Sequence, residues 1–130
     1  MTTHEIQMRV RDYECDLQGI VNNANYQHYT EHARHEMLLQ MGVSFADLHR
    51  RGIDAVVARI TLSYKTPLHS TDDFVVRTRV QKEGVRYVFH QDIVRLADQK
   101  LACRAIVDIV AVVNGELVTK CPELDELLVP

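Results

Sequence analysis

Asp16 is the carboxylate whose surroundings in this sequence are best suited to chemistry. It opens the segment DLQGIVNN (16–23), in which Gly19 and two asparagines lead into a predicted helix. The first N–H groups of a helix lack internal partners and favour negative charge, so they can stabilise the oxyanion of an attacked carbonyl. A nearby carboxylate can attack that carbonyl or activate a water. The same residues also fit a plain turn with a helix cap at Asn23 or Asn25, and the residues alone leave both interpretations open.

Three histidines on the predicted helix raise the question of a metal site. His28, His32 and His35 are spaced i, i+4, i+7 and fall within one narrow arc. The opposite arc is the predicted core face and carries Tyr26, Tyr29, Ala33, Met37 and Met41. Zinc could use these histidines with Glu31, but the spacing lacks the HExxH arrangement. We therefore favour a solvent-facing or interface role for them and expect no metal.

Cys15 is a competing nucleophile by residue type. Because it is adjacent to Asp16, its side chain would point the other way in an extended segment, and no histidine partner can be assigned to it. An isolated cysteine is more often a small apolar filler. Farther along, Glu31 and Arg34 are expected either to orient the loop or an oligomer interface, or to form an exposed i, i+3 ion pair.

The elements that must position these residues follow a simple order. A first strand is predicted from about Ile6 to Tyr13, a loop over 16–23, and a long helix from about Asn25 to Met41 that ends at Gly42. Ser44 is a candidate cap for a short second helix that Gly52 closes. Alternating strands are then predicted over 56–65, 74–81, 85–96 and 101–113, with turns at 82–84, 97–100 and 114–115. This order is α+β.

The two faces of the predicted sheet differ in composition. One is apolar and suits packing on the long helix. The other mixes polar Arg59, Thr61, Ser63, Arg77, Arg79, Arg104 and Asp108 with apolar Val57, Ile106 and Val110. Such a face is too apolar to be fully hydrated and too polar for a core, so we expect a homo-oligomer to bury it, with an ordinary solvated face as the alternative.

The overall composition excludes several classes of function. The chain has 130 residues and 46% hydrophobic content, which indicates one compact domain spanning 1–130. A net charge of −3, without a long basic run, gives no reason to bind nucleic acid or a membrane surface. Cys15, Cys103 and Cys121 are odd in number and lack CxxC spacing, as expected of free thiols in a reducing compartment. With no visible secretory signal and no longer apolar run than Ile109–Val113, we expect a cytoplasmic protein without membrane insertion.

A resemblance to a known family sharpens this picture. The spacing Y-x-x-D-x-x-G-x-V-x-x-x-x-Y-x-x-x-x-E-x-x-R closely resembles that of hotdog-fold thioesterases of the 4-hydroxybenzoyl-CoA thioesterase type. It is carried here by Tyr13, Asp16, Gly19, Val21, Tyr26, Glu31 and Arg34. The segment RITLSYKTPLHSTDDFVV (59–76) continues the similarity through Tyr64, Pro67 and Asp73. The resemblance implies a single hotdog domain, in which an antiparallel sheet of five or six strands wraps a long central helix.

The fuller string RDYE.D..G.VNNA.Y is most similar to bacterial relatives of plant acyl-lipid (methylketone-synthase-type) thioesterases, which hydrolyse fatty acyl and β-ketoacyl thioesters of acyl carrier protein. This resemblance implies that Asp16 is the catalytic carboxylate, as nucleophile or general base, and that the Asn23 N–H polarises the carbonyl. The Tol-Pal-associated branch usually has histidine at the position of Asn23, so that branch fits less well. The implied substrate-binding positions are Gly19, Val21, Asn22, Tyr26, Arg59, Thr61 and Ser63.

The resemblance also sets expectations for partners. We expect an acyl thioester of carrier protein or CoA as substrate, no cofactor, and a homodimer or a dimer of dimers (a homotetramer). Two alternatives remain. A hotdog dehydratase or hydratase would want a histidine paired with a carboxylate, and no histidine lies in the loop beside Asp16. A non-catalytic acyl-binding module would bind acyl chains without turning them over.

Overall fold

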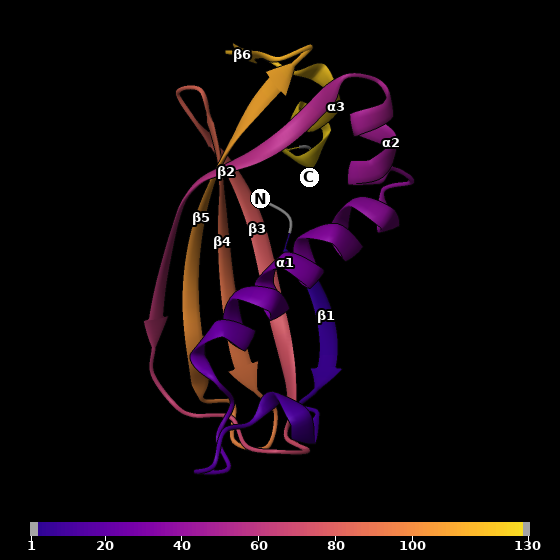
Figure 1. The fold of residues 1–130 in the computed structure, drawn as a ribbon. Helices are drawn as coiled ribbons and strands as arrows, with labels where there is room; N and C mark the ends of the chain where they lie inside the picture. The colour runs from indigo at the N-terminus through magenta and orange to yellow at the C-terminus, as the bar shows by residue number, and fades with distance from the viewer. Residues whose placement is uncertain (1–2, 129–130) are drawn as a thin grey trace.

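The computed structural model describes residues 3–128, in which a curled antiparallel sheet carries one long helix across one face (Figure 1). The strands are β1 (His4–Arg9), β2 (Ile53–Tyr64), β3 (Asp73–Glu83), β4 (Arg86–Arg95), β5 (Leu101–Val113) and β6 (Glu116–Val118). The helices are α1 (Asn23–Gln40), α2 (Phe45–Arg50) and α3 (Pro122–Asp125), with 3-10 turns η1 (Asp12–Glu14) and η2 (Glu126–Leu128). The strand order is β1-β3-β4-β5-β2, and β6 pairs with β5. The predicted α+β fold with five or six strands is therefore confirmed.

Helix α1 begins where a side chain can satisfy its first amides. The Oδ1 of Asn22 accepts a hydrogen bond from the Ala24 N–H at 3.1 Å, so Asn22 is the cap and the helix starts two residues before the predicted Asn25. Gly42, at a φ of +82°, follows its end, as predicted. The predicted core residues Tyr26, Tyr29, Ala33 and Met37 are buried, whereas Met41 is half-buried.

Two apolar clusters hold the sheet against α1. The first packs the C-terminal half of the helix, at Met37 and Leu38, against residues that include Tyr87 and Phe89 of β4. The second packs the N-terminal half against the other end of the sheet and contains Val21, Tyr26, Tyr29, Leu68 and Phe74. Because Val21 and the half-buried Cys15 both belong to this second cluster, the loop between them is tied directly to the core.

The first strand and the last residues differ from their predictions. β1 ends at Arg9 instead of Tyr13, because residues 12–14 turn as η1 when the Glu14 carboxylate accepts the Arg11 N–H at 2.7 Å. α2 is capped as predicted, with the Ser44 hydroxyl accepting the Asp47 N–H at 3.0 Å. Residues 122–128 form α3 and η2, which the strand pattern does not predict.

A register shift in β2 changes which side chains face the helix. The pairing of β2 with β5 is irregular between Val57 and Arg59, as in a β-bulge. As a result Val57 lies with Ile60 beside α1, and the prediction that Val57 belongs to the outer face is wrong.

The outer face of the sheet carries several ion pairs between strands. Arg104 lies 2.9 Å from Asp92, Arg77 lies 3.1 Å from Glu5, and Arg86 lies 3.1 Å from Asp108. Ile106 remains exposed among them. Separately, none of the helices within residues 3–128 combines the length and the apolar composition needed to cross a lipid bilayer.

Candidate active site

Asp16 lies at the start of a tight loop closed by backbone hydrogen bonds. Its N–H donates to the Ile20 carbonyl at 2.9 Å, and the Gly19 N–H donates to the Asp16 carbonyl at 3.0 Å. Gly19 has a φ of +79°, and no heavy atom lies within 4 Å of the position that a Cβ would take. Glycine is therefore favoured here by backbone conformation and not by lack of space. The exposed Asp16 carboxylate accepts the Gln18 N–H at 2.8 Å, which fixes its direction within the loop.

The loop is also paired with a neighbouring segment. Cys15 and Val21 form an antiparallel bridge that closes its base, and Ile20 forms a second bridge with His69. The Val21 N–H donates to the Leu68 carbonyl at 2.8 Å. These contacts hold both sides of the loop, so Asp16 is presented on a fixed backbone.

Glu14 connects this loop to the start of α1. Its buried carboxylate accepts the Tyr29 hydroxyl at 2.9 Å and two donors of Arg11, the backbone N–H at 2.7 Å and Nη1 at 3.0 Å. Its backbone carbonyl accepts the Asn22 N–H at 2.9 Å and the Asn25 Nδ2 at 2.8 Å. Burial and the adjacent Glu14 carboxylate raise the pKa of Tyr29, which keeps the phenol protonated as a donor.

These contacts leave one amide free at the helix start. The Asn22 N–H is bonded to the Glu14 carbonyl, the Ala24 N–H to the Asn22 side chain, and the Asn25 N–H to the Asn22 carbonyl at 2.9 Å. Among residues 22–25, the N–H of Asn23 alone has no acceptor in the part of the chain that the structure describes. An unpaired N–H at the positive end of a helix dipole is the group that a carbonyl oxygen or oxyanion needs.

Asn23 lines a cavity of about 250 Å³ between the helix start and the end of β2. Its other lining residues are Ile20, Val21, Tyr26, Tyr64, Lys65, Thr66, Pro67 and Ala102. Tyr26 forms the buried wall, since its hydroxyl accepts the Leu68 N–H at 3.1 Å and its ring centroid lies 5.5 Å from that of Tyr64. The cavity therefore combines apolar side chains with a few polar groups, among them the residue that carries the unpaired amide, an arrangement suited to an acyl carbonyl.

Comparison with known proteins identifies the family. The model of the Thioesterase-like superfamily matches residues 10–128, which include the loop, all of α1 and strands β2 to β6. The chain belongs to the Thioesterase-like superfamily. This finding confirms the predicted family resemblance.

Individual relatives agree with this assignment. The acyl-acyl carrier protein thioesterases ATL3 and ATL2 of Arabidopsis thaliana are 38% and 40% identical over 98 residues. Those matches cover 75% of this chain and 52% of each relative, so the chain spans about half the length of these curated relatives. A solved structure of a hypothetical protein from Aquifex aeolicus matches with a TM-score of 0.88 at 28% identity. The match covers 96% of this chain and 98% of the Aquifex chain.

A second solved structure supports the fold alone. The 1,4-dihydroxy-2-naphthoyl-CoA thioesterase Slr0204 from Synechocystis has a TM-score of 0.90, with 98% of this chain and 96% of that chain covered, but it is only 14% identical. With the strand order described above, these neighbours confirm the predicted hotdog architecture.

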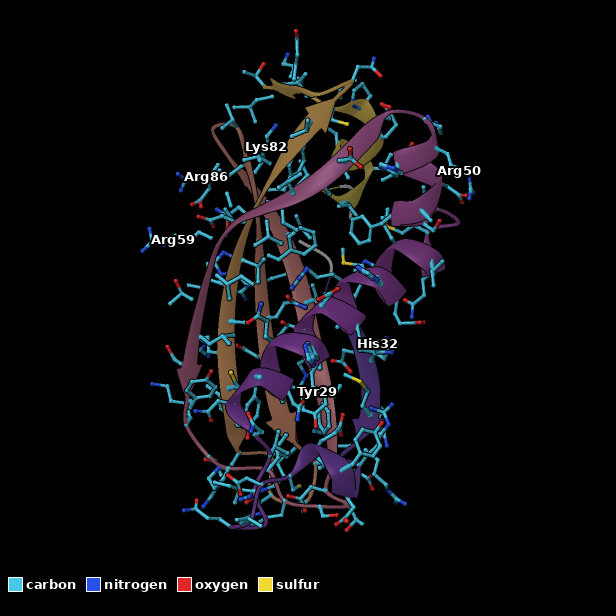
Figure 2. All side chains as sticks on the ribbon, in the orientation of Figure 1. Tyr29, His32, Arg50, Arg59, Lys82 and Arg86 are labelled. Atoms are coloured by element: carbon cyan, nitrogen blue, oxygen red, sulfur yellow. The ribbon has the colours of Figure 1, made fainter. Side chains whose placement is uncertain are left out.

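In this thioesterase-like domain the predicted site residues divide into two groups. Val21, Asn23 and Tyr26 line the cavity; Asn22, which caps the helix, and Asp16 and Gly19, in the preceding loop, are next to it in the chain but are not among its lining residues. The second group, on β2, does not line this cavity, and its members are Arg59, Thr61 and Ser63. Figure 2 shows the Arg59 side chain directed away from α1.

Several residues of the site have no counterpart in the sequence-based predictions. Lys65, Thr66 and Ala102 meet in the cavity because the Lys65 and Thr66 amides both donate to the Ala102 carbonyl, at 2.9 and 3.3 Å. Only the β2–β5 register brings them together, and no local pattern signals it. Glu14 is part of the RDYE string quoted above. Its burial could not be predicted from the sequence, because it lies outside the periodic pattern of any helix or strand.

The other chemically capable residues lie apart from the cavity. His28, His32 and His35 are exposed on α1, and residues 3–128 contain no cluster of three His, Cys, Asp or Glu side chains arranged for a metal ion. Burial and the nearby Asp12 and Asp16 raise the pKa of the Cys15 thiol, which disfavours the nucleophilic thiolate.

One histidine lies closer to the loop than the sequence suggests. His69 pairs with Ile20, and its Nδ1 lies 3.5 Å from the Asp72 carboxylate. The long-range pairing with the loop cannot be read from its position in the sequence.

Proposed function

We propose that this chain is a thioesterase that hydrolyses fatty acyl thioesters, including 3-oxoacyl ones, of acyl carrier protein or CoA. One observation carries the proposal: the Asn23 N–H is the amide left unpaired at the α1 start within the described residues, and Asn23 lines a cavity next to the Asp16 loop. The names of the two Arabidopsis relatives support a carrier-protein thioester as substrate. We extend the proposal to residues 1–130 acting as a single catalytic domain.

The mechanism assigns one role to each group. The thioester carbonyl oxygen accepts the Asn23 N–H, which together with the helix dipole stabilises the negative charge that develops on attack. Asp16 then either attacks the carbonyl carbon, releasing the thiolate and leaving an acyl anhydride for water to cleave, or removes a proton from an attacking water. Both routes consume one water and yield a carboxylic acid and a free thiol, without a cofactor.

The carrier portion of the substrate would lie outside the cavity. Lys65 is the cationic residue of the cavity lining and is exposed, so it can meet a phosphate of the pantetheine arm at the entrance. Arg59, Thr61 and Ser63 remain proposed binding residues, with their role confined to contacts beyond the cavity.

We also propose that the protein self-associates as a dimer or a dimer of dimers. β2 is an edge strand of 12 residues, with Val56 and Val57 exposed, and long unpaired edges are usually covered in native proteins. A cytoplasmic location is supported by the cysteines, since Cys15, Cys103 and Cys121 are all free thiols.

The test compares thiol release from acyl-CoA and acyl-carrier-protein thioesters of varied chain length by wild type and Asp16→Asn. We expect wild type to release thiol and Asp16→Asn to lower kcat at least about 100-fold, because the amide neither attacks nor accepts a proton. Asp12→Asn is the matched control: Asp12 is exposed, accepts the Ser70 hydroxyl at 3.1 Å, and should keep wild-type turnover. If Asp16→Asn retains most of the turnover, the assignment of Asp16 is wrong.

One observation favours a second candidate, a hydratase or dehydratase. The His69–Asp72 pair beside the loop is the histidine–carboxylate combination that such chemistry uses. Hydration of an enoyl thioester that His69→Gln abolishes, without thiol release, would select this candidate. Binding of acyl thioesters without any turnover would select a non-catalytic module.

A further inference from the structure

A second concave region continues the line of the cavity along α1 and β2. It has a volume of about 310 Å³, and its lining includes Gln27, which directly follows Tyr26 of the cavity. On β2, Ile60 lines this region and Tyr64 lines the cavity, and the alternation of the strand puts both on one face. We call this region the distal groove. A ligand that is held at Asn23 and extends along α1 therefore enters the distal groove.

Arg34 is the unusual residue of the distal groove. It is only 4% exposed, yet its guanidinium makes a single hydrogen bond with the described residues, from Nη1 to the Gln91 Oε1 at 3.0 Å. Within residues 3–128 it forms no ion pair, so the predicted exposed pair with Glu31 is wrong. No fully buried side-chain nitrogen of the described residues lacks a partner, so the other guanidinium nitrogens reach the groove. A buried guanidinium with unused donors favours a ligand that brings an acceptor.

The carboxylates of the groove decide the charge of that ligand. Glu31 lies one turn before Arg34, is exposed, and has its ion-pair contact at 4.0 Å, with His35 Nε2. Asp54 also lines the groove and lies 2.6 Å from His49 Nδ1. Two carboxylates disfavour an anion here, and the guanidinium disfavours a cation. A neutral hydroxyl fits both neighbours, because its oxygen accepts from Arg34 and its proton is donated to Glu31.

The positions along α1 set the distance between this hydroxyl and the thioester. Glu31 and Arg34 are 8 and 11 residues beyond Asn23. They therefore lie about 12 Å and about 16 Å along the helix axis from that amide. The terminal carbon of an extended dodecanoyl chain lies about 14 Å from its carbonyl carbon at ordinary C–C bond lengths. A hydroxyl on that carbon falls between the two side chains.

We propose that the distal groove selects acyl chains that carry a hydroxyl group at the far end, with Arg34 donating to the hydroxyl oxygen and Glu31 accepting its proton. Val57, Ile60 and Ile109 supply apolar contacts for the chain itself. A plain chain of the same length covers the unused donors of Arg34 without offering an acceptor, so it is disfavoured. This inference rests on the proposed thioester hydrolysis and names the class of acyl chain on which it acts.

The first test is a competition between dodecanoyl and ω-hydroxydodecanoyl thioesters of the same carrier in one reaction, with both free acids measured by mass spectrometry. Their ratio reports relative kcat/KM and does not depend on how much of the enzyme is active or associated. We expect wild type to favour the hydroxy substrate at least about tenfold. The control Glu36→Gln removes a carboxylate on the β1 side of α1, near His4, and should keep this ratio. Equal or greater use of the dodecanoyl thioester by wild type overturns the proposal.

The second test removes the two polar groups one at a time. Arg34→Met keeps most of the side-chain length but deletes the donors, so the preference for the hydroxy substrate should fall at least about tenfold. If Arg34→Met does not fold, Glu31→Leu replaces it, at a position whose side chain is 53% exposed. That variant should lower the preference at least about threefold. An unchanged preference in a folded variant overturns the proposal.

Failure of the proposed hydrolysis is recognised separately. If wild type releases no thiol from either substrate, the two free acids are compared by isothermal titration calorimetry. Binding of ω-hydroxydodecanoic acid at least about tenfold tighter than dodecanoic acid supports the selectivity of the groove while the hydrolysis fails. Equal binding overturns both.

Discussion

Glu14 and Arg34 are both buried charged side chains beside helix α1, but they differ in how completely the chain satisfies them. Glu14 is 8% exposed and its carboxylate accepts three hydrogen bonds, from Tyr29 and twice from Arg11. Arg34 is 4% exposed and carries five N–H donors, of which one is bonded within the described residues. Within the described residues, the loop that holds Asp16 is thus satisfied by its own chain, whereas the Arg34 guanidinium is satisfied only in part.

The difference indicates two separate tasks along one helix. A self-sufficient loop can be positioned in a single chain, so changes there should alter turnover and local stability. The region around Arg34 adjoins the open edge of β2, so changes there should alter the proposed self-association first. Variants that change turnover and association equally would show that the loop and the region around Arg34 do not have separate tasks.

Glu14→Ala should have the largest effect in the loop region. It removes the acceptor of three donors and leaves the buried Tyr29 hydroxyl and Arg11 N–H unpaired, which should lower the free energy of unfolding by about 1–3 kcal/mol. Displacement of the loop should also lower kcat about 100-fold, since small misplacements of reacting groups are costly. Urea unfolding and thiol release measure the two effects. The dissociation constant of the proposed dimer should stay within about twofold of wild type. A large rise would show that the loop also controls association, which contradicts the separation of the two regions.

Tyr29→Phe should have a smaller effect. It deletes one donor to Glu14 but keeps the ring, which packs with its centroid 4.7 Å from that of Phe74. Because Arg11 still donates to the carboxylate, we expect a loss of about 1 kcal/mol in the free energy of unfolding and a fall in kcat below about tenfold. An effect as large as that of Glu14→Ala would show that the phenol itself takes part in the reaction.

Cys15→Ala should have the smallest effect. The raised pKa of the Cys15 thiol means that little thiolate exists at neutral pH, and the thiolate fraction grows only as the pH rises toward that pKa. We expect kcat to stay within about threefold of wild type across neutral pH. Loss of thiol release in Cys15→Ala, with Asp16 intact, would make the cysteine the nucleophile.

Much of the fold follows from local patterns in the sequence. The 3.6-residue period places Tyr26, Tyr29 and Met37 on the buried face of α1, and the alternating strand predicted over 74–81 is found as β3, with Phe74 and Val76 buried in the core. Features that depend on pairing between distant segments do not follow. The irregularity in β2 near Val57 interrupts an alternation that appears continuous in the sequence, so every side chain before it changes face.

The candidate site could be predicted to a similar extent. The segment 16–23 contains the loop and the helix start, but which amide stays free depends on Asn22 being the cap, and that is a matter of geometry. Arg34 looks like half of a local ion pair with Glu31, whereas its partner Gln91 is 57 residues away across the sheet. Sequence spacing cannot show such a contact.

The central claim is that the Asn23 N–H binds the thioester carbonyl, and a proline substitution tests it most directly. Asn23 is the first residue of α1, where proline is well tolerated, and Asn22 before it has φ −62° and ψ 137°, which suit a residue that precedes proline. Asn23→Pro therefore removes the N–H while the helix is retained, and Asn23→Ala is the control that keeps the N–H and loses only the side chain. We predict that Asn23→Pro lowers kcat for acyl-thioester hydrolysis by about 100- to 1,000-fold and that Asn23→Ala stays within about threefold of wild type. Equal activity in a folded Asn23→Pro protein and in Asn23→Ala would contradict the account.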